Sequence, residues 1–252
     1  MRTMLVCIGI FAIWFGWISH TARQQRKAVE WIRSHGGEVW YEDEFGIDSI
    51  GYVAELDPNE RPAERIPLPR EWKASVLRDY EWRVVAAAVH VGSDASLIAP
   101  LHDLEYLSLY RTDISDLRPI AGLTKLKRLE LEQTEVEDIS TLRHFTHLAR
   151  LNLTNTRVRD LPPLSGLSDL EQLELDRTEV TDLSALKGLT KLSQLDLSHT
   201  NIAVFDSLHG LHNLSTIDVT NTNATPHQIE ALQEALPSCD VFEWGKGRSN
   251  DE

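Results

Sequence analysis

Residues 101–122 read LHDLEYLSLYRTDISDLRPIAG, and residues 123–144 read LTKLKRLELEQTEVEDISTLRH. The shared pattern, LxxLxxLxLxxTx(I/V)xDLxxLxx, recurs every 22 residues without an insertion through residue 210. A sixth copy starts at Leu211 as LHNLSTIDVTNTNA and then departs from the pattern. Such a period is typical of a solenoid, because one repeat cannot bury its own leucines and needs a neighbour on each side.

Each repeat is expected to contribute one short strand. Leu107 and Leu109 alternate with a period of two, and we expect both to point into the core. Successive strands, about 4.8 Å apart, would form one parallel sheet. A repeat of this length has no room for a regular α-helix, so the return path is expected to be extended or a short 3₁₀ turn. The wider return side would bend the stack into an arc with the sheet on its concave face. The expected strands are residues 107–109, 129–131, 151–153, 173–175, 195–197 and 217–219.

This repeat resembles the 22-residue leucine-rich repeats of internalins and related bacterial proteins. The resemblance covers Leu101–Ala224, and a decayed copy is expected upstream, with Val85, Asp94, Ile98 and Leu101 one period ahead of their counterparts. It implies an α/β solenoid that binds another macromolecule and is not an enzyme. The family usually has asparagine where this chain has a column of threonines: Thr112, Thr134, Thr156, Thr178, Thr200 and Thr222.

Two polar columns accompany the leucines. The threonine hydroxyls lie where each strand ends, and we expect them to bond to loop backbone. A column of aspartates, which Val204 interrupts, is expected to cap the turn that follows each strand. Calcium binding is the weaker interpretation, because a calcium ion needs several oxygens at one point. These aspartates are Asp116, Asp138, Asp160 and Asp182.

The N-terminus carries an apolar segment. Met4–Ile18 reads MLVCIGIFAIWFGWI, and Arg23, Arg26 and Lys27 follow it. As a helix, the uncharged stretch around it would be about 30 Å long, the thickness of a bilayer's hydrocarbon core. We predict one uncleaved transmembrane anchor, since His20-Thr21-Ala22 is a poor match to a signal-peptide cleavage site. A cleaved signal peptide is the alternative, and both membrane orientations stay open. The anchor and its RQQRKAVEWIRSHGGEVWYEDE continuation look like those of bacterial membrane-anchored repeat proteins.

Both ends of the solenoid are expected to carry caps. A helix with Ala28 and Ile32 on its apolar face should end at Gly36-Gly37. Residues 39–41 suggest a strand that could pair with residues 50–53. A helix over residues 71–80 is expected to cover the first repeat, because an open solenoid end exposes its core.

At the other end, Thr225 is expected to cap a helix that Pro226 begins and Pro237 ends, followed by an edge strand over residues 241–244. The chain divides into an anchor and juxtamembrane helix (1–35), a linker and N-terminal cap (36–84), the solenoid (85–224), and a C-terminal cap and tail (225–252).

Composition limits the functions that the chain can have. The net charge is −14, with 39 acidic and 25 basic residues, which disfavours nucleic acid and favours a basic protein or peptide as partner. No phosphate-binding loop, nucleophile elbow or cysteine ligand pair is present, so no cofactor, metal or catalytic residue is expected. The two cysteines, Cys7 and Cys239, suggest no disulfide framework.

The concave sheet face is the expected binding surface. An acidic column through its centre borders a partly basic column, and two tyrosines, a residue type common in interfaces, lie at one end. The candidate partner-binding residues are Tyr106, Tyr110, Arg128, Glu130, Glu132, Arg150, Asn152, Glu174, Asp176, Asp196 and Asp218. Two other functions remain open: a structural envelope protein with no specific partner and, with less support, an enzyme whose site lies in residues 36–84.

Overall fold

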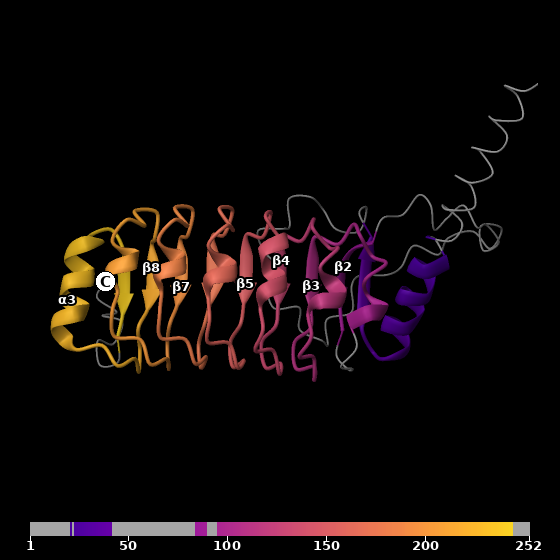
Figure 1. Ribbon diagram of the computed structural model, residues 1–252, viewed down its shortest axis with the longest axis horizontal. Coiled ribbons are helices and arrows are strands. Elements are labelled where there is room, and N and C mark those ends of the chain that lie inside the picture. Colours follow the sequence, from indigo (N-terminus) through magenta and orange to yellow (C-terminus); the bar gives the residue numbers. More distant parts are fainter. Residues whose placement is uncertain (1–20, 22, 42–83, 90–94, 244–252) are drawn as a thin grey trace, which may run out of the picture.

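The structure, a computed structural model, describes residues 21, 23–41, 84–89 and 95–243. These residues form one sheet of nine strands that lie side by side in chain order (Figure 1). The strands are β1 (Glu38–Tyr41), β2 (Val84–Ala88), β3 (Tyr106–Ser108), β4 (Arg128–Glu130), β5 (Arg150–Asn152), β6 (Gln172–Glu174), β7 (Gln194–Asp196), β8 (Thr216–Asp218) and β9 (Asp240–Phe242).

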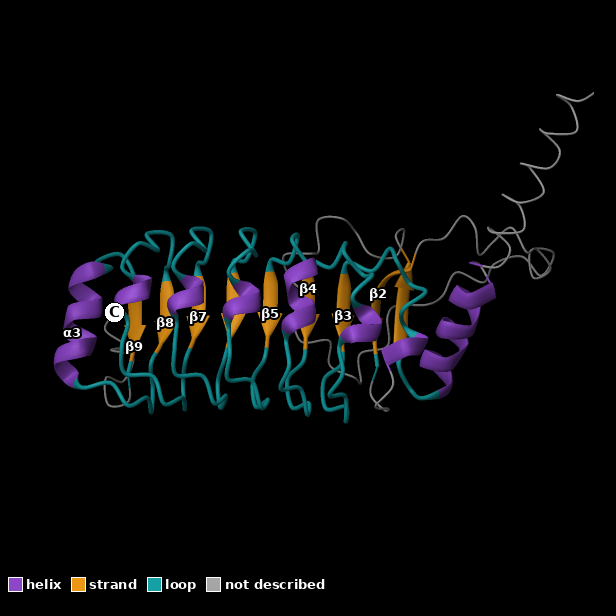
Figure 2. Ribbon diagram, viewed as in Figure 1, coloured by secondary structure: helices purple, strands orange, loops and turns teal. Residues whose placement is uncertain are grey.

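Short 3₁₀ helices form the return path of the repeats, as expected, and line up opposite the strands (Figure 2). They are η3 (Ala95–Leu97), η4 (Arg118–Ile120), η5 (Ser140–His144), η6 (Pro162–Leu164), η7 (Ser184–Leu186) and η8 (Asp206–Leu208). An α-helix, α3 (Pro226–Ala235), follows β8. Residues 23–34 are also helical, at the other end of the stack.

The parallel sheet is confirmed, with a shift in its strand boundaries. Leu107 pairs with Leu129, and each later strand keeps the 22-residue register through Ile217. Each strand begins and ends one residue earlier than predicted. The amide of Leu109 still donates to the carbonyl of Glu130 at 2.9 Å. The amide of Arg111 also donates to the carbonyl of Glu132, and the left-handed conformation of this residue then turns the chain away from the sheet.

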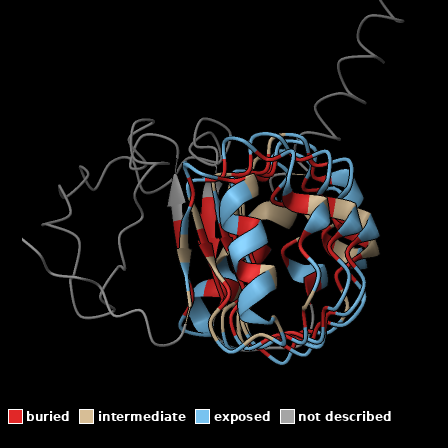
Figure 3. Ribbon diagram, turned by 90° about the vertical axis from the view of Figure 1, so that its left-hand side faces the viewer, coloured by how far each residue is buried: buried red, intermediate tan, exposed pale blue. Residues whose placement is uncertain are grey.

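The core lies between the sheet and the 3₁₀ row, and a view along the stack shows buried positions on the ribbon of both (Figure 3). Leu107, Leu129 and Leu151 are at most 2% exposed. The expected inward position of the upstream copy was wrong, because Ala87, and not Val85, pairs with Leu107. The stretch between β2 and η3 has fewer residues than the corresponding stretch of the later repeats. Counting back 22 residues from Leu107 therefore gave the wrong inward residue.

A left-handed residue turns the chain at the end of each repeat strand. Arg111, Gln133, Asn155, Arg177, His199 and Asn221 have φ between 53° and 57°. The threonine that follows donates its hydroxyl hydrogen to the carbonyl three residues earlier, at 2.6–2.9 Å in all six repeats. The threonine column therefore closes the turn of its own repeat, as expected, and is not available to a ligand.

The aspartate column caps the next turn in three repeats. Asp116, Asp138 and Asp182 accept a hydrogen bond from the amide two residues later at 2.8–2.9 Å. The amide of Ser184 also holds the pKa of the Asp182 carboxyl below its ordinary value. Asp160 cannot make this bond, because the residue two positions later is Pro162, which has no amide hydrogen. The prediction of a cap at Asp160 was therefore wrong.

The solenoid core continues into both ends of the described chain. Ala28 and Ile32, on the helix of residues 23–34, belong to the same buried cluster as the repeat leucines. That helix ends at Gly36, whose φ is +77°, and β1 then pairs antiparallel with β2. At the far end Thr225 and Gln228 form a reciprocal capping box, and Leu232 of α3 is fully buried. The predicted helix that begins at Pro226 is thus confirmed, and the helix of residues 23–34 packs against the N-terminal end of the core.

Several predicted segments lie outside the described residues. They include Met4–Ile18, the proposed partner strand at residues 50–53 and the expected helix at residues 71–80. In the described part of the chain, no helix combines the length and the hydrophobicity that crossing a bilayer requires.

Replacing Gly37 by alanine should weaken the N-terminal cap. A Cβ atom at Gly37 would lie 2.4 Å from the carbonyl oxygen of Ala88 and 2.7 Å from Cγ2 of Ile32. Because one neighbour is backbone, the helix has to move off the sheet, and we expect a loss of about 1–3 kcal/mol in urea unfolding. Gly166→Ala, where no atom lies within 4 Å, is the control and should change stability by less than about 0.5 kcal/mol. Equal effects would show that the helix is not packed as described.

Candidate functional site

The outward-pointing residues of β3 to β9 form one surface, which we call the sheet face. Side chains on alternate positions of a strand point to the same side, so the pairing register fixes the columns of this face. The first column is Tyr106, Arg128, Arg150, Gln172, Gln194, Thr216 and Asp240, and the central column is Ser108, Glu130, Asn152, Glu174, Asp196, Asp218 and Phe242. A third column follows just beyond the strands: Tyr110, Glu132, Thr154, Asp176, Ser198 and Thr220. The corresponding residues of β2, Ala86 and Ala88, are buried, so the open part of the face begins at β3.

The end of the sheet face near β3 combines tyrosine with arginine. The guanidinium of Arg128 lies over the ring of Tyr106, 5.5 Å from its centroid, and pairs with the carboxylate of Glu130. Arg111 lies over Tyr110 at 4.8 Å and donates to the side chain of Gln133. Burial raises the pKa of Tyr106, and the nearby charge of Glu130 raises it further. The aromatic end therefore presents flat rings whose neighbouring cations are already engaged.

Three carboxylates lie in consecutive positions of the central column. Glu174 is in register with Asp196, and Asp196 is in register with Asp218. Within the described part of the chain, none of the three forms an ion pair. Asp196 and Asp218 accept hydrogen bonds from the amides of Ser198 and Thr220, whereas no described residue donates a hydrogen bond to the carboxylate of Glu174. We call Glu174, Asp196 and Asp218 the acidic ladder.

The surroundings of Glu174 and Asp196 disfavour the negative charge of these two carboxylates. Partial desolvation, reinforced by the charges of Glu130 and Asp196, raises the pKa of Glu174 to about 7. The pKa of Asp196 is raised as well, by desolvation and by the charges of Asp218 and Asp176, against the hydrogen bonds from Ser198. The residue Glu174 is nevertheless exposed to solvent. The ladder is thus an accessible row of carboxylates that a nearby cation would stabilise.

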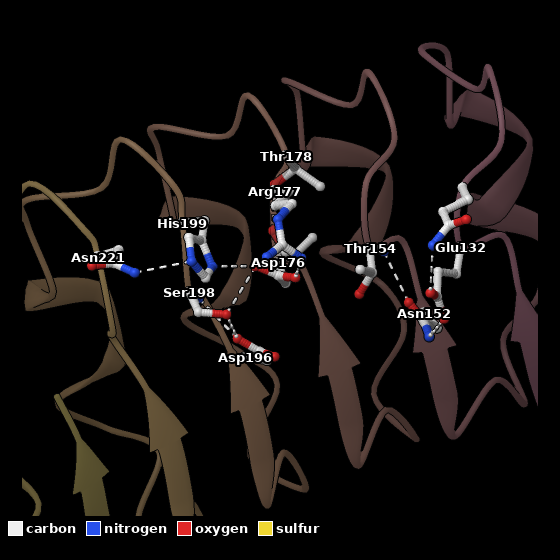
Figure 4. Close-up of polar contacts among 12 residues, drawn as sticks. Glu132, Asn152, Thr154, Asp176, Arg177, Thr178, Asp196, Ser198, His199 and Asn221 are labelled. Atoms are coloured by element: carbon white, nitrogen blue, oxygen red, sulfur yellow. Dashed lines mark hydrogen bonds and ion pairs between the residues drawn. The ribbon is translucent and has the colours of Figure 1, made fainter. Parts of the chain in front are cut away.

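A hydrogen-bonded network flanks the acidic ladder in the third column (Figure 4). The carboxylate of Asp176 accepts a hydrogen bond from Arg177 at 2.7 Å, and it lies 3.0 Å from Ser198 Oγ and 2.7 Å from Nδ1 of His199. The other ring nitrogen of His199 lies 2.9 Å from the side-chain nitrogen of Asn221. Asp176 is therefore held in place by its neighbours, in contrast to Glu174.

The network contains serine, histidine and aspartate but does not assemble a nucleophile. Ser198 Oγ lies 2.6 Å from a carboxylate oxygen of Asp196 and 3.0 Å from one of Asp176, so its single hydrogen is directed at a carboxylate and not at the ring of His199. Among the described residues, no cluster of three or more histidine, cysteine, aspartate or glutamate side chains could hold a metal ion. What this surface offers is charge, hydrogen bonding and aromatic contact.

The structure places the predicted candidate residues on one face, but their side chains make different contacts. Glu130 is paired with Arg128, and the amide nitrogen of Asn152 lies 3.4 Å from Glu132. Tyr106, Arg128 and Arg150 occupy consecutive positions of the first column. Their role in binding a partner stays a prediction.

One aromatic residue of the sheet face was missed in the sequence analysis. Phe242 of β9 is in register with Asp218 and is 39% exposed. The sequence indicated a final strand here, but α3 separates that strand from the repeats, so the 22-residue period could not give its register. The sheet face therefore ends in aromatic side chains at both ends, with the acidic ladder between them.

The raised pKa of Glu174 predicts a pH-dependent effect of Glu174→Gln on stability. An unfolded chain has the ordinary pKa of 4.5 at this position, so folding favours the protonated form over the range from about 4.5 to about 7. The contribution of Glu174 to stability is then fully present below pH 4.5 and is lost as the pH rises through about 7. Glutamine stays neutral, so the variant should melt higher than the wild type at pH 8, with little difference at pH 4.5.

The measurement is a series of thermal melts of both proteins from pH 4.5 to 8. Glu137→Gln, at an exposed position between β4 and η5, controls for the loss of a charge. A melting difference that does not change with pH would contradict the raised pKa.

Comparisons with known proteins agree with the repeat architecture. Residues 146–202 match a family model described as leucine rich repeat. No curated protein matches the sequence. The crystal structure of internalin C2 from Listeria monocytogenes is similar, with a TM-score of 0.60 and 27% identity over 63% of this chain and 70% of that chain. That of internalin F from the same organism gives a TM-score of 0.50 and 27% identity over 61% of this chain and 53% of that chain. The repeats of this chain therefore form a leucine-rich-repeat solenoid that resembles those of the Listeria internalins.

Proposed function

We propose that this protein binds a partner protein through the sheet face and that the partner presents basic side chains to it. The observation that carries the proposal is the acidic ladder, in which three carboxylates are stacked in register and form no ion pair with any described residue. Repulsion among these charges costs stability in the free protein, and a cationic partner would remove that cost. The internalin-like fold also supports binding, because proteins of this type are generally binding proteins without enzymatic activity.

The charge arrangement favours the approach of a basic partner from a distance as well as the contacts in the complex. The carboxylates of Glu174, Asp176, Asp196 and Asp218 lie on neighbouring strands and turns, so their fields add over one part of the face. The chain as a whole carries a net charge of −14, which would attract a basic partner from a distance. The tyrosines at one end and Phe242 at the other supply the aromatic contacts that give an interface specificity.

Capture experiments test the binding proposal. The full-length wild type, a sheet-face variant with Tyr106→Ala and Phe242→Ala, and a control with Lys187→Ala and Asp206→Ala on the 3₁₀ side would each be used to isolate partners from the native host. We expect a protein that the wild type and the control retain and the sheet-face variant loses. Identical capture by all three would reject the sheet face as the binding surface. It would favour a structural role for this face, with no specific partner on it.

We further propose that Met4–Ile18 anchors the protein in a membrane as a single-pass segment. The support is its uninterrupted apolar sequence and the basic residues that follow it. The helix of residues 23–34 begins soon after this segment and packs into the solenoid core through Ala28 and Ile32. An anchor joined in this way would hold the solenoid close to the bilayer.

Membrane fractionation tests the anchor. Full-length protein should sediment with membranes and resist a carbonate wash, because a spanning helix is released only by detergent. Mature protein isolated from the host should begin at or near Met1. An N-terminus near Arg23 would instead show a cleaved signal peptide, and release by carbonate would reject a spanning helix.

A further inference from the structure

We propose that the segment of the partner that occupies the sheet face is an α-helix lying along the stack, with three basic residues and one apolar residue at positions i, i+3, i+7 and i+10. The inference rests on the proposed binding function and adds the conformation and sequence pattern of the ligand. The helix would lie across β6 to β9, where the central column reads Glu174, Asp196, Asp218 and Phe242.

The spacing of the strands selects a helix. Neighbouring strands lie about 4.8 Å apart, so the residues after Glu174 in the central column lie about 4.8, 9.6 and 14.4 Å along the stack. Positions i+3, i+7 and i+10 of an α-helix lie about 4.5, 10.5 and 15 Å from position i, and they share one stripe of its surface. Every contact then falls within about 1 Å of its partner, a difference that flexible lysine side chains can absorb.

An extended segment does not match this spacing. Its side chains on one face recur about every 6.7 Å, so the second and third would miss their strands by about 2 and 4 Å. An extended segment running parallel to the strands would cross the acidic ladder and meet only one or two of its carboxylates. The ladder is therefore better matched to one basic side chain per helical turn.

The width of the sheet face also suits one helix. Its three columns are two residues apart along each strand, which places the outer columns about 13 Å apart. A helix with its side chains is about 10–12 Å across. A helix centred on the ladder would touch Gln194 on one side and the network of Asp176 and Ser198 on the other.

Phe242 gives the helix a direction. It is an exposed aromatic side chain one strand beyond Asp218 in the same column, where a fourth carboxylate would continue the ladder. An apolar side chain of the partner at i+10 would cover this ring, whereas a basic one would lose its carboxylate contact. The reversed helix would place its apolar residue against Glu174, which is the less favourable arrangement.

Synthetic peptides test this inference on the full-length protein in neutral detergent. The probe is a capped, alanine-rich peptide with lysines at i, i+3 and i+7 and leucine at i+10. One control has the same composition in a permuted order, and a second carries a central proline that breaks the helix. Binding would be followed by fluorescence anisotropy at low ionic strength, with the variants Asp196→Asn and Phe242→Ala and the 3₁₀-side control Asp206→Asn.

We expect the patterned peptide to bind at least about tenfold more tightly than either control peptide, a difference of about 1.4 kcal/mol. Asp196→Asn and Phe242→Ala should each remove most of that advantage, and Asp206→Asn should leave it unchanged. Equal binding of the three peptides, or an advantage that survives both sheet-face variants, would overturn the helix inference. If a captured protein still needs Tyr106 and Phe242, the binding proposal would stand and only the conformation of the ligand would be wrong.

Discussion

Leu151→Ala should unfold at a much lower urea concentration than the wild type, with a loss of about 2–5 kcal/mol. Leu151 is 2% exposed and lies in β5, between Leu129 and Leu173 of the neighbouring strands. Truncation removes most of a buried side chain, and the rigid strands on both sides limit collapse into the cavity. Because neighbouring repeats stabilise one another, the loss affects the centre of the solenoid.

Gln194→Ala is the matched control for this core truncation. Gln194 is an exposed residue of β7 on the sheet face, next to the buried Leu195. Its replacement should change the free energy of unfolding by less than about 0.5 kcal/mol. Similar losses in the two variants would contradict the assignment of the inward and outward positions of the strands.

Reversing two charges of the acidic ladder, with Glu174→Lys and Asp196→Lys together, should weaken partner binding by at least about a hundredfold, or about 2.7 kcal/mol. The two residues are in register on adjacent strands, and reversal replaces two attractive contacts with repulsive ones. The same reversal at Glu137 and Asp206, away from the sheet, should change affinity only through net charge. The measurement is calorimetric titration of the captured partner against each variant.

The salt dependence of the same titration gives a second criterion. Wild-type affinity should fall as salt rises, because exposed charges are screened beyond about 10 Å at 0.1 M ionic strength. The ladder variant should have a weaker dependence. Equal losses from the two double variants would place the interface elsewhere on the solenoid.

The 22-residue period made most of the fold predictable. It gave the strand order, the register from Leu107 to Ile217 and the 3₁₀ return path, because every repeat buries the same positions. The period says nothing about where it is broken. The upstream strand, with Ala87 inward, the cap formed by the helix of residues 23–34 and the register of β9 depend on contacts that no other repeat shares.

Local turn chemistry was only partly predictable. The threonine bonds follow from a hydroxyl placed after a strand, but the left-handed residue before each threonine has no common residue type, as Arg111, Gln133 and Asn155 illustrate. A glycine at these positions would have given the signal. The failure at Asp160 could have been anticipated, since Pro162 has no amide hydrogen to donate.

The candidate site was predictable in its position and not in its electrostatics. Alternation along each strand placed all the candidate residues on one face. Whether a charged side chain on that face forms an ion pair depends on side-chain geometry: Glu130 is paired with Arg128, whereas Glu174 forms no ion pair within the described part of the chain. The sequence pattern assigned both to one acidic column and could not distinguish them.

Site-specific photocrosslinking from the sheet face tests the binding account most directly. A photoreactive amino acid would replace Gln194 on β7 or, as control, Lys187 after η7 in full-length protein expressed in its native host. Neither change alters the acidic ladder. The account predicts a discrete crosslinked product from position 194, lost when Glu174 and Asp196 are reversed to lysine, and no such product from position 187. A discrete product from position 187 with none from position 194 would contradict it.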